Sequence, residues 1–339
     1  MSDWAAALRR IRGELLFRLL GMGRAGLAPA GPLPRAATMP ALTAERSEQP
    51  LAAIGMVLLA MFLFSGMDGL SKLVTADYHP AEIAALRFLF TIPALLPFAL
   101  RAEFPPWRTP VPLLQIGRGV AMVASSILFI FGLAQLPIAD ATAIGFVTPL
   151  LVTALSIPLL GETVGVRRWA AVVIGFIGVL IVMRPGTGAF NPAALYPLLS
   201  AASWALGMIL TRRMRSIDRV LTTMLYSAVV GFAVSALALP FVWRMPSPMA
   251  WGLFALMGAL NASGQSLLAA AFNRAGASLL APFSYSQMVW SSLIGYFVFA
   301  TIPDGATWTG AAIVIATGLY TLHRERVVAQ QRRSRGARL

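Results

Sequence analysis

The side chains best placed to do chemistry in this chain are charges inside apolar stretches. Asp68 and Lys72 lie four residues apart in the segment FSGMDGLSKLV, so a helix would place them on one face. One interpretation is an ion pair in which the two charges neutralise each other. The other is a gate or an anchor for a charged cargo, and the two are compatible. A charge in hydrocarbon costs about 2.5–3.5 kcal/mol on insertion scales, so both side chains should face a partner or a cavity.

Three further charges lie near the ends of apolar stretches. Arg87 is predicted to pair with Asp68 or Glu82, or to contact cargo. Glu82 suits the first turn of a helix, next to the positive end of the helix dipole. Asp140 opens a later stretch, where its side chain is predicted to cap a helix. Neither acid is a strong candidate for a proton relay.

Arg118 is another charge within an apolar stretch, and it lies near one end of that stretch. It shares a helix face with Met122 and Ser125. A long arginine stem can run along apolar surface while the guanidinium reaches water. We expect Arg118 to reach the membrane surface in this way.

Uncharged polar and aromatic side chains take the place of charges in the second half of the chain. The candidates for the wall of a cargo site are Ser203, Trp204, Asn261, Gln265, Tyr285 and Gln287. Asn261 and Gln265 lie one helical turn apart and are the favoured pair. The alternative use of such residues is hydrogen bonding between helices, worth about 0.6 kcal/mol each.

Prolines mark places where helices can bend, because each one removes a backbone hydrogen bond. The candidate hinges, in stretches that correspond between the two halves, are Pro149, Pro158 and Pro282. Small residues allow helices to approach closely. The candidates for such contacts are Gly175, Gly178, Gly310 and Gly318.

The elements that must hold these residues are membrane helices. The chain of 339 residues is 58% hydrophobic and 12% charged, with a mean hydropathy of +0.75. Its apolar segments approach the roughly 20 residues that cross ~30 Å of hydrocarbon. They are 51–74, 81–100, 111–134, 138–160, 167–183, 191–211, 220–242, 249–272, 277–299 and 306–323. The pattern predicts an all-α polytopic membrane protein with ten transmembrane helices.

Basic residues fall almost entirely on one side of these segments. Most of the 27 Lys and Arg lie in the two tails and in every second connection, whereas only Arg184 and Arg244 lie in the opposite loops. Because basic loops stay on the cytoplasmic side, both termini are predicted to be cytoplasmic. The loops 184–191 and 243–248 are predicted to lie outside, and the expected location is the inner (plasma) membrane.

The two tails are expected to do no chemistry. Residues 1–50 hold a short helical stripe followed by a Pro/Ala/Gly-rich tether, which predicts a flexible cytoplasmic extension. An interfacial helix on anionic lipid is one alternative, and a true start at Met39 is another. Residues 324–339 are predicted to form a basic cytoplasmic tail.

The apolar segments follow the same order twice, which indicates an internal repeat. Residues 51–184 and 191–323 hold five segments each, and the stretch beginning ADATAI at Ala139 aligns with the stretch beginning ASLLAP at Ala277. An odd number of segments per half turns the second half over in the membrane. This predicts two inverted five-helix repeats around a central cavity, with the substrate near the midplane.

Short motifs in this order resemble the EamA-type drug/metabolite transporter superfamily. They are LRF in the second segment, ADATAI followed by a proline and LLGE in the fourth, and LLAPFSYSQ in the ninth. The resemblance covers 51–323 and implies a ten-helix bundle, alternating access and a small organic metabolite as cargo. Family members with MDxxSK in the first segment include riboflavin and S-adenosylmethionine uptake proteins. Glu162, whose counterpart in the second half is not an acid, is assigned to local loop structure.

Other classes of function lack the residues that they need. The chain has no cysteine and only two histidines, which lie far apart, so neither thiol chemistry nor a metal site is expected. It has no phosphate-binding G-x-x-x-x-G-K-[ST] loop, which argues against ATP-driven transport. Its arginines are dispersed over short loops and tails, which argues against nucleic-acid binding.

We therefore expect a secondary transporter of an amphipathic or zwitterionic metabolite, resembling an amino acid, riboflavin or S-adenosylmethionine, and no enzyme, cofactor or metal. A multidrug exporter of the same fold is the first alternative, and a polytopic membrane enzyme or scaffold is the next. The expected partners are the lipid bilayer and a small-molecule substrate. A proton or other coupling ion, a homodimer and the direction of transport stay open.

Overall fold

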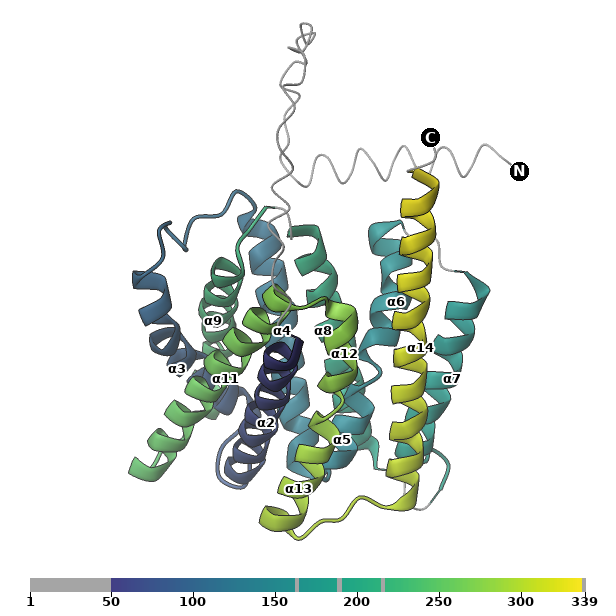
Figure 1. Ribbon diagram of the computed structural model, residues 1–339. Helices are drawn as coiled ribbons and strands as arrows, with labels where there is room; N and C mark the ends of the chain where they lie inside the picture. The colour runs from purple at the N-terminus through teal and green to yellow at the C-terminus, as the bar shows by residue number, and fades with distance from the viewer. Residues whose placement is uncertain (1–49, 162–164, 188–190, 215–216, 337–339) are drawn as a thin grey trace, which may run out of the picture. The chain divides into compact units, whose positions relative to one another are not determined.

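Helices make up the regular structure of residues 50–336, apart from 162–164, 188–190 and 215–216, which is the part of the chain that this computed structural model describes. Side chains are described for the same residues except 277–278 and 325–336. The elements are α2 Pro50–Val74, α3 Pro80–Leu100, α4 Pro112–Gln135, α5 Ile138–Gly145, α6 Thr148–Leu160, α7 Val166–Met183, η1 Pro192–Ala194, α8 Leu195–Met214, α9 Val220–Ala236, α10 Leu239–Val242, α11 Pro248–Arg274, α12 Ala277–Ser284, α13 Gln287–Phe299 and α14 Gly305–Gly336. None of the described residues forms a β-strand, so the predicted all-α class is confirmed for them (Figure 1).

Length and composition make this chain a multi-pass membrane protein. Within the described residues, eight helices are long and apolar enough to cross a membrane, with α5 and α6 counted as one. The helix α9, with 17 residues, is a shorter apolar helix. Proline lies in the first turn of α3, α4, α6 and α11, where its missing N–H is not needed and its fixed φ suits the start of a helix. The expected number of ten crossings stays a prediction.

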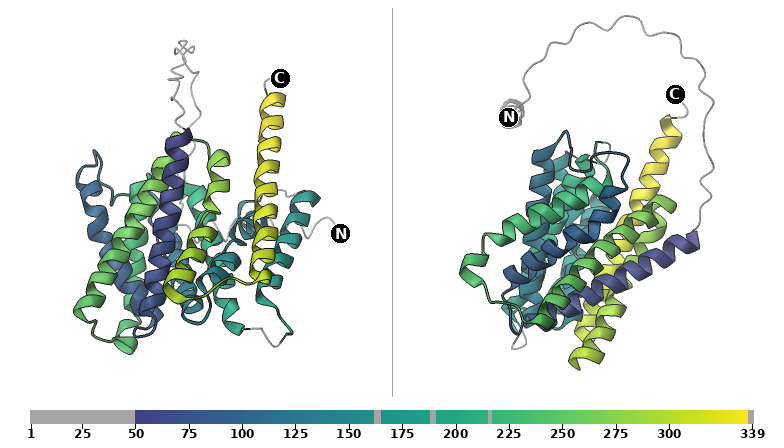
Figure 2. Two further views of the ribbon diagram at one scale, coloured as in Figure 1. Left: turned by 60° about the horizontal axis from the view of Figure 1, so that its bottom comes forward. Right: turned by 90° about the vertical axis from the view of Figure 1, so that its left-hand side faces the viewer.

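The two halves of the chain pack against each other in a matched way. α2 contacts α11 as α8 contacts α4, α3 contacts α11 as α9 contacts α4, and α2 contacts α13 as α8 contacts α6. α3 contacts α9 and α7 contacts α14, and each of these two pairs is its own counterpart. Figures 1 and 2 show the green and yellow helices of the second half beside the purple, blue and teal helices of the first. Exchanging the halves leaves these packed pairs unchanged.

Each half contains one long helix that is broken at a two-residue turn. α5 has 8 residues and α6 has 13, and α12 and α13 repeat these lengths. Both second pieces end at a residue with left-handed backbone, Gly161 at φ 71° and Ala300 at φ 51°. These matches pair Ile138 with Ala277, so the alignment expected from sequence was wrong by one residue. Apolar residues resemble one another at neighbouring positions, which hides such a shift.

Two glycines allow α7 and α14 to touch along their backbones. A Cβ atom on Gly310 would lie 2.5 Å from the Gly178 carbonyl oxygen, and one on Gly178 would lie 2.9 Å from the Gly310 carbonyl oxygen. Gly175 is confined by the side chains of Leu150 and Thr317, and Gly318 by the side chain of Tyr285. The sequence predicted close contacts at these four positions, and the structure agrees.

Some expectations fall outside the described residues. The N-terminal extension lies there except for Pro50, as do Glu162 and residues 337–339 of the basic tail. α14 continues to Gly336, so the apolar segment expected to end at residue 323 is followed by further helix.

Candidate functional site

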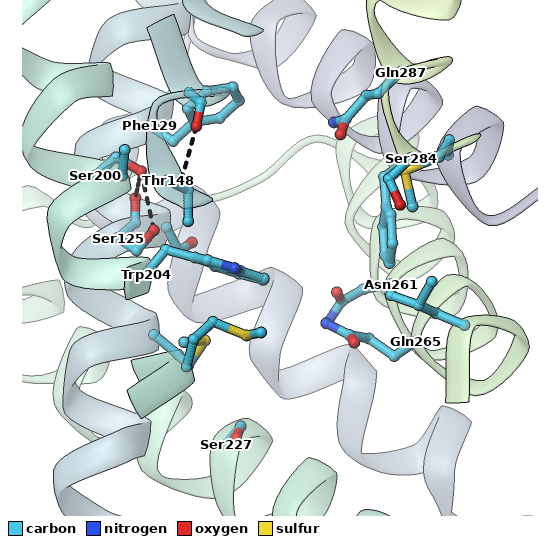
Figure 3. A pocket seen from close by; sticks show the side chains of 18 of the residues that line it. Ser125, Phe129, Thr148, Ser200, Trp204, Ser227, Asn261, Gln265, Ser284 and Gln287 are labelled. Carbon is cyan, nitrogen blue, oxygen red and sulfur yellow. Dashed lines mark hydrogen bonds between the residues drawn. The ribbon is translucent and has the colours of Figure 1, made fainter. Parts of the chain in front are cut away.

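A cavity of about 580 Å³ lies among α2, α3, α4, α8, α9 and α11 and reaches the turns that break α5–α6 and α12–α13. Its volume is within the range of roughly 300–1,000 Å³ that small-molecule sites occupy. The residues that were proposed for transport and line this cavity are Asp68, Arg87, Trp204, Asn261, Gln265, Tyr285 and Gln287. Lys72 and Ser203 do not line it. Figure 3 shows the cavity from close by.

Two opposite charges are buried where α2 and α3 border the cavity. The exposed fraction is 4% for Asp68 and 7% for Arg87. Gln287 Nε2 donates to Asp68 Oδ2 at 3.4 Å, and Arg87 Nη2 donates to the Ser126 hydroxyl on α4. Arg87 Nε has no hydrogen-bond partner in the described part of the chain. Of the two acids that the sequence offered to Arg87, Asp68 lines the same cavity, and within the described residues no salt bridge joins Arg87 to either acid.

The ion pair expected between Asp68 and Lys72 is not the arrangement in the structure. Lys72 Nζ donates to the carbonyl oxygens of Leu133 at 2.6 Å and Leu136 at 2.7 Å, and it lies 5.6 Å from the centre of the Phe299 ring. These carbonyls are at the end of α4, where a helix has no N–H groups of its own left to offer. The negative end of the helix dipole also attracts the ammonium group. Lys72 therefore joins α2 to the end of α4.

Uncharged polar and aromatic side chains also line the cavity. In Figure 3, Trp204 on α8 extends its ring toward Asn261 and Gln265 on α11. Asn261 Nδ2 donates to the Thr91 hydroxyl at 3.2 Å, so a bond to α3 positions this amide. The indole ring and the two amides all line the cavity.

Arg118 also lines the cavity, although the sequence analysis assigned it to the membrane surface. Its Nε donates to the Thr211 hydroxyl at 2.7 Å, and its Nη1 donates to the Thr223 carbonyl at 3.3 Å and to the Ser227 hydroxyl. These partners on α8 and α9 hold the guanidinium inside the bundle, so the surface placement was wrong. The available signal was its helix face, because Met122, one turn along, lines the cavity too.

Hydroxyl side chains link the helices around the cavity, and the sequence analysis did not place them in contact. The Ser125 and Ser200 hydroxyls are 3.0 Å apart between α4 and α8. The Ser291 hydroxyl on α13 lies 3.0 Å from that of Thr142 on α5 and 3.4 Å from that of Ser65 on α2. Serine and threonine are common throughout the chain, so only their positions in space distinguish these five.

The turns that break the two long helices meet at the cavity. Phe146 caps the end of α5 and Tyr285 caps the end of α12, and their rings pack edge to face with centres 5.1 Å apart. Pro149 lies in the first turn of α6 and lines the cavity, while Pro158 lies inside α6 and Pro282 inside α12. Their role as hinges stays a prediction.

Asp140 and Glu82 were both predicted to lie at helix starts, and only Glu82 has its predicted role. Asp140 does not cap α5, whose N-cap is a proline; its Oδ1 accepts a hydrogen bond from the Thr307 hydroxyl on α14 at 2.7 Å. Thr307 N–H also donates to Asp304 at 2.9 Å, and Arg184 forms a salt bridge with Asp304. The Thr307 N–H and the Arg184 guanidinium hold the pKa of Asp304 below its usual value. Glu82 does lie in the first turn of α3, and its carboxylate accepts a hydrogen bond at 3.3 Å from the backbone N–H of Arg244, before α11.

Two stretches of the chain, residues 51–184 and 191–322, match the EamA-like transporter family, and together they hold every helix that lines the cavity. The chain belongs to the EamA-like transporter family. This confirms the family expected from the short motifs, and with it the expectation of a transporter for small organic molecules.

Relatives of this EamA-like chain are named for different cargoes. An S-adenosylmethionine uptake transporter of Rickettsia felis is 31% identical over 276 residues, covering 81% of this chain and 94% of its own. A riboflavin transporter of Rhizobium johnstonii is 30% identical over 287 residues, covering 84% and 95%. A pseudopaline exporter of Pseudomonas aeruginosa is 27% identical over 267 residues, covering 77% and 92%. A solved crystal structure at 21% identity has a TM-score of 0.58 and covers 82% of this chain and 99% of its own, which shows a shared fold.

Proposed function

We propose that this transporter moves a small amphipathic or zwitterionic metabolite of the S-adenosylmethionine type across the inner membrane by alternating access. The observation that carries the proposal is the make-up of the cavity lining, which holds the charged side chains of Asp68 and Arg87 together with the Trp204 ring and the amides of Asn261 and Gln265. A molecule with a charged end and a flat ring matches both kinds of group. Identity of 31% over most of the chain to a protein named for S-adenosylmethionine uptake supports this cargo class.

The architecture in this proposal is ten crossings arranged as two inverted repeats. The support is the set of packed helix pairs that is unchanged when the halves are exchanged, together with the broken helices of equal lengths. Five crossings per half require the second half to enter the membrane from the opposite side. Related halves of this kind can rock about a central site and expose it to each side in turn.

In this proposal the cavity faces the cytoplasm. Its lining extends to Arg212 near the end of α8, Phe272 near the end of α11 and Leu322 on α14, which are the helix ends that the basic loops assign to the cytoplasmic side. Toward the opposite side, Lys72 joins α2 to the end of α4. Release of that contact is part of the outward opening that alternating access requires.

Transport into liposomes that contain the purified protein tests the proposed function. We expect uptake of labelled S-adenosylmethionine, with competition by close analogues. Lipophilic cations should compete poorly, because they would strip water from the charged side chains without pairing with them. If lipophilic cations block transport while S-adenosylmethionine, riboflavin and amino acids do not, the protein is a multidrug exporter and the proposal is wrong.

Removal of either amide should weaken cargo binding more than it weakens folding. For Asn261→Ala and Gln265→Ala we expect a loss of about 0.5–1.5 kcal/mol each in binding, which is roughly a twofold to tenfold rise in Kd for S-adenosylmethionine. Ser266→Ala is the matched control, since Ser266 lies on the same helix and donates to the Ala262 carbonyl at 2.8 Å. Titration calorimetry and thermal melting separate the two effects. Lower melting temperatures with unchanged affinity would contradict the assignment.

A reporter fused after Leu339 should be active only if it works in the cytoplasm. The reason is the excess of Lys and Arg in the tails and in alternate connections. A second fusion within the loop 243–248 should behave in the opposite way. An active periplasmic phosphatase after Leu339 would show that the orientation or the number of crossings is wrong.

A further inference from the structure

Arg118 has hydrogen-bond donors that the surrounding protein leaves free. Its three bonds go to uncharged groups, namely the Thr211 hydroxyl, the Thr223 carbonyl and the Ser227 hydroxyl. They engage Nε and Nη1, and Nη2 has no bond within the described residues. Because Arg118 lines the cavity, its guanidinium is open to a ligand there.

Asp218, two residues before α9, has its carboxylate held by other groups. Asp218 Oδ2 accepts from the Thr109 hydroxyl at 2.5 Å and from Gln115 Nε2 at 2.7 Å. Within the described residues, no carboxylate forms a salt bridge with Arg118. A guanidinium inside a membrane bundle is costly unless an anion, a carbonyl or water meets it. The Thr223 carbonyl meets one side of the Arg118 guanidinium, and the free Nη2 is left for a group in the cavity.

The two ends of the cavity differ in net charge. At one end the lining holds the cation Arg87 and the acid Asp68, whose formal charges cancel. At the other end, among the described residues, it holds the cations Arg118 and Arg212 and no acid. A cargo that fits the whole cavity brings a negative group to the Arg118 end.

These ends are too far apart for one small head group to reach both. Arg118 and Ser126 lie on the same helix, and at 1.5 Å per residue they are about 12 Å apart along its axis. Ser126 is the residue that bonds Arg87. In Figure 3, Ser227, which bonds Arg118, and Gln287, which bonds Asp68, lie at opposite ends of the view, with the indole ring and the two amides between them.

We propose that Arg118 binds an acidic group, a carboxylate or a phosphate, at one end of an elongated cargo whose other end reaches Asp68 and Arg87. The inference rests on the proposed function and adds to it the orientation of the cargo. Guanidinium groups bind both kinds of anion through paired N–H donors. The flat part of the cargo then lies between Trp204 and the amides of α11.

The test compares two probes that differ only in the acidic group. S-adenosylmethionine and its decarboxylated form are titrated against the full-length purified protein and against Arg118→Gln. We expect Arg118→Gln to weaken binding of S-adenosylmethionine by about tenfold or more and to change binding of the decarboxylated form by less than about twofold. Riboflavin and riboflavin 5′-phosphate form a second pair, in which selective loss of the phosphate ester identifies a phosphate site.

Further variants separate binding from folding. Thr211→Val removes one bond to Arg118 and keeps the charge, so it should retain the preference for the acidic probe. Arg118→Lys keeps a cation if the neutral variant fails to fold, and it too should retain part of that preference. If Arg118→Gln weakens binding of both probes in a pair equally, Arg118 only supports the fold. The proposed transport function would be unaffected by that result. If none of the four probes binds to the wild-type protein, the proposed cargo class is wrong and the inference falls with it.

Discussion

Arg87→Met alone should abolish transport and lower the free energy of unfolding by about 3–5 kcal/mol. The change leaves the Asp68 carboxylate, which is 4% exposed, with only the 3.4 Å hydrogen bond from Gln287. The double variant Asp68→Asn/Arg87→Met removes both charges and should recover most of the lost stability, because no unpaired charge stays buried. Thermal unfolding and liposome uptake of the three proteins measure both effects.

The double variant also separates a structural pair from a cargo site. If it folds but does not transport, the charges contact the cargo or its coupling ion; full transport would show that they serve only the fold. Asp68→Asn/Lys72→Met is the matched control. Its two effects should simply add, since Lys72 bonds the end of α4 and not Asp68. If this double variant loses less stability than either single variant does, Asp68 and Lys72 do form an ion pair within α2.

Gly310→Ala should destabilise the protein, because the new methyl group would force α7 and α14 apart. The new Cβ would lie 2.5 Å from the Gly178 carbonyl oxygen, and a backbone atom cannot move aside as a flexible side chain can. Overpacking of this kind costs about 1–3 kcal/mol or more. Thermal melting of the purified protein measures the loss.

Gly252→Ala is the matched control for that prediction. Gly252 is also inside a long helix, α11, but a Cβ there would meet nothing within 4 Å. We expect a change within about 0.5 kcal/mol or a small gain, because alanine favours helix more than glycine does. Equal melting temperatures for Gly310→Ala and Gly252→Ala would show that α7 and α14 are not in backbone contact.

Hydropathy located the helices because a chain in hydrocarbon must satisfy its own backbone hydrogen bonds. α3 runs over Pro80–Leu100 where the apolar segment 81–100 predicted it. The same signal could not reveal the turns inside the segments 138–160 and 277–299, because an apolar stretch stays apolar across a break. Regular structure was therefore easier to predict than its interruptions.

The lining of the cavity was partly predictable, but the partners of its charges were not. Asn261 and Gln265 were expected at the cavity because two amides one turn apart in an apolar helix need a polar neighbour. Spacing along one helix suggested that Lys72 would pair with Asp68. It could not show that main-chain oxygens of another helix lie closer to the lysine, nor that helices α8 and α9 surround Arg118.

The contact between Lys72 and α4 has an evolutionary consequence. Its acceptors are the carbonyl oxygens of Leu133 and Leu136, which any amino acid at those positions would also supply. The two positions can therefore vary among descendants of this protein without loss of the bond. Because only their main chain contacts Lys72, no covariation between Lys72 and these positions is expected. A genetic selection for suppressors of Lys72→Met should accordingly return reversion to a basic residue, and no charge exchange at residue 133 or 136. Asp68 and Arg87, whose charged side chains both line the cavity, are the positions where a compensating pair of changes can arise.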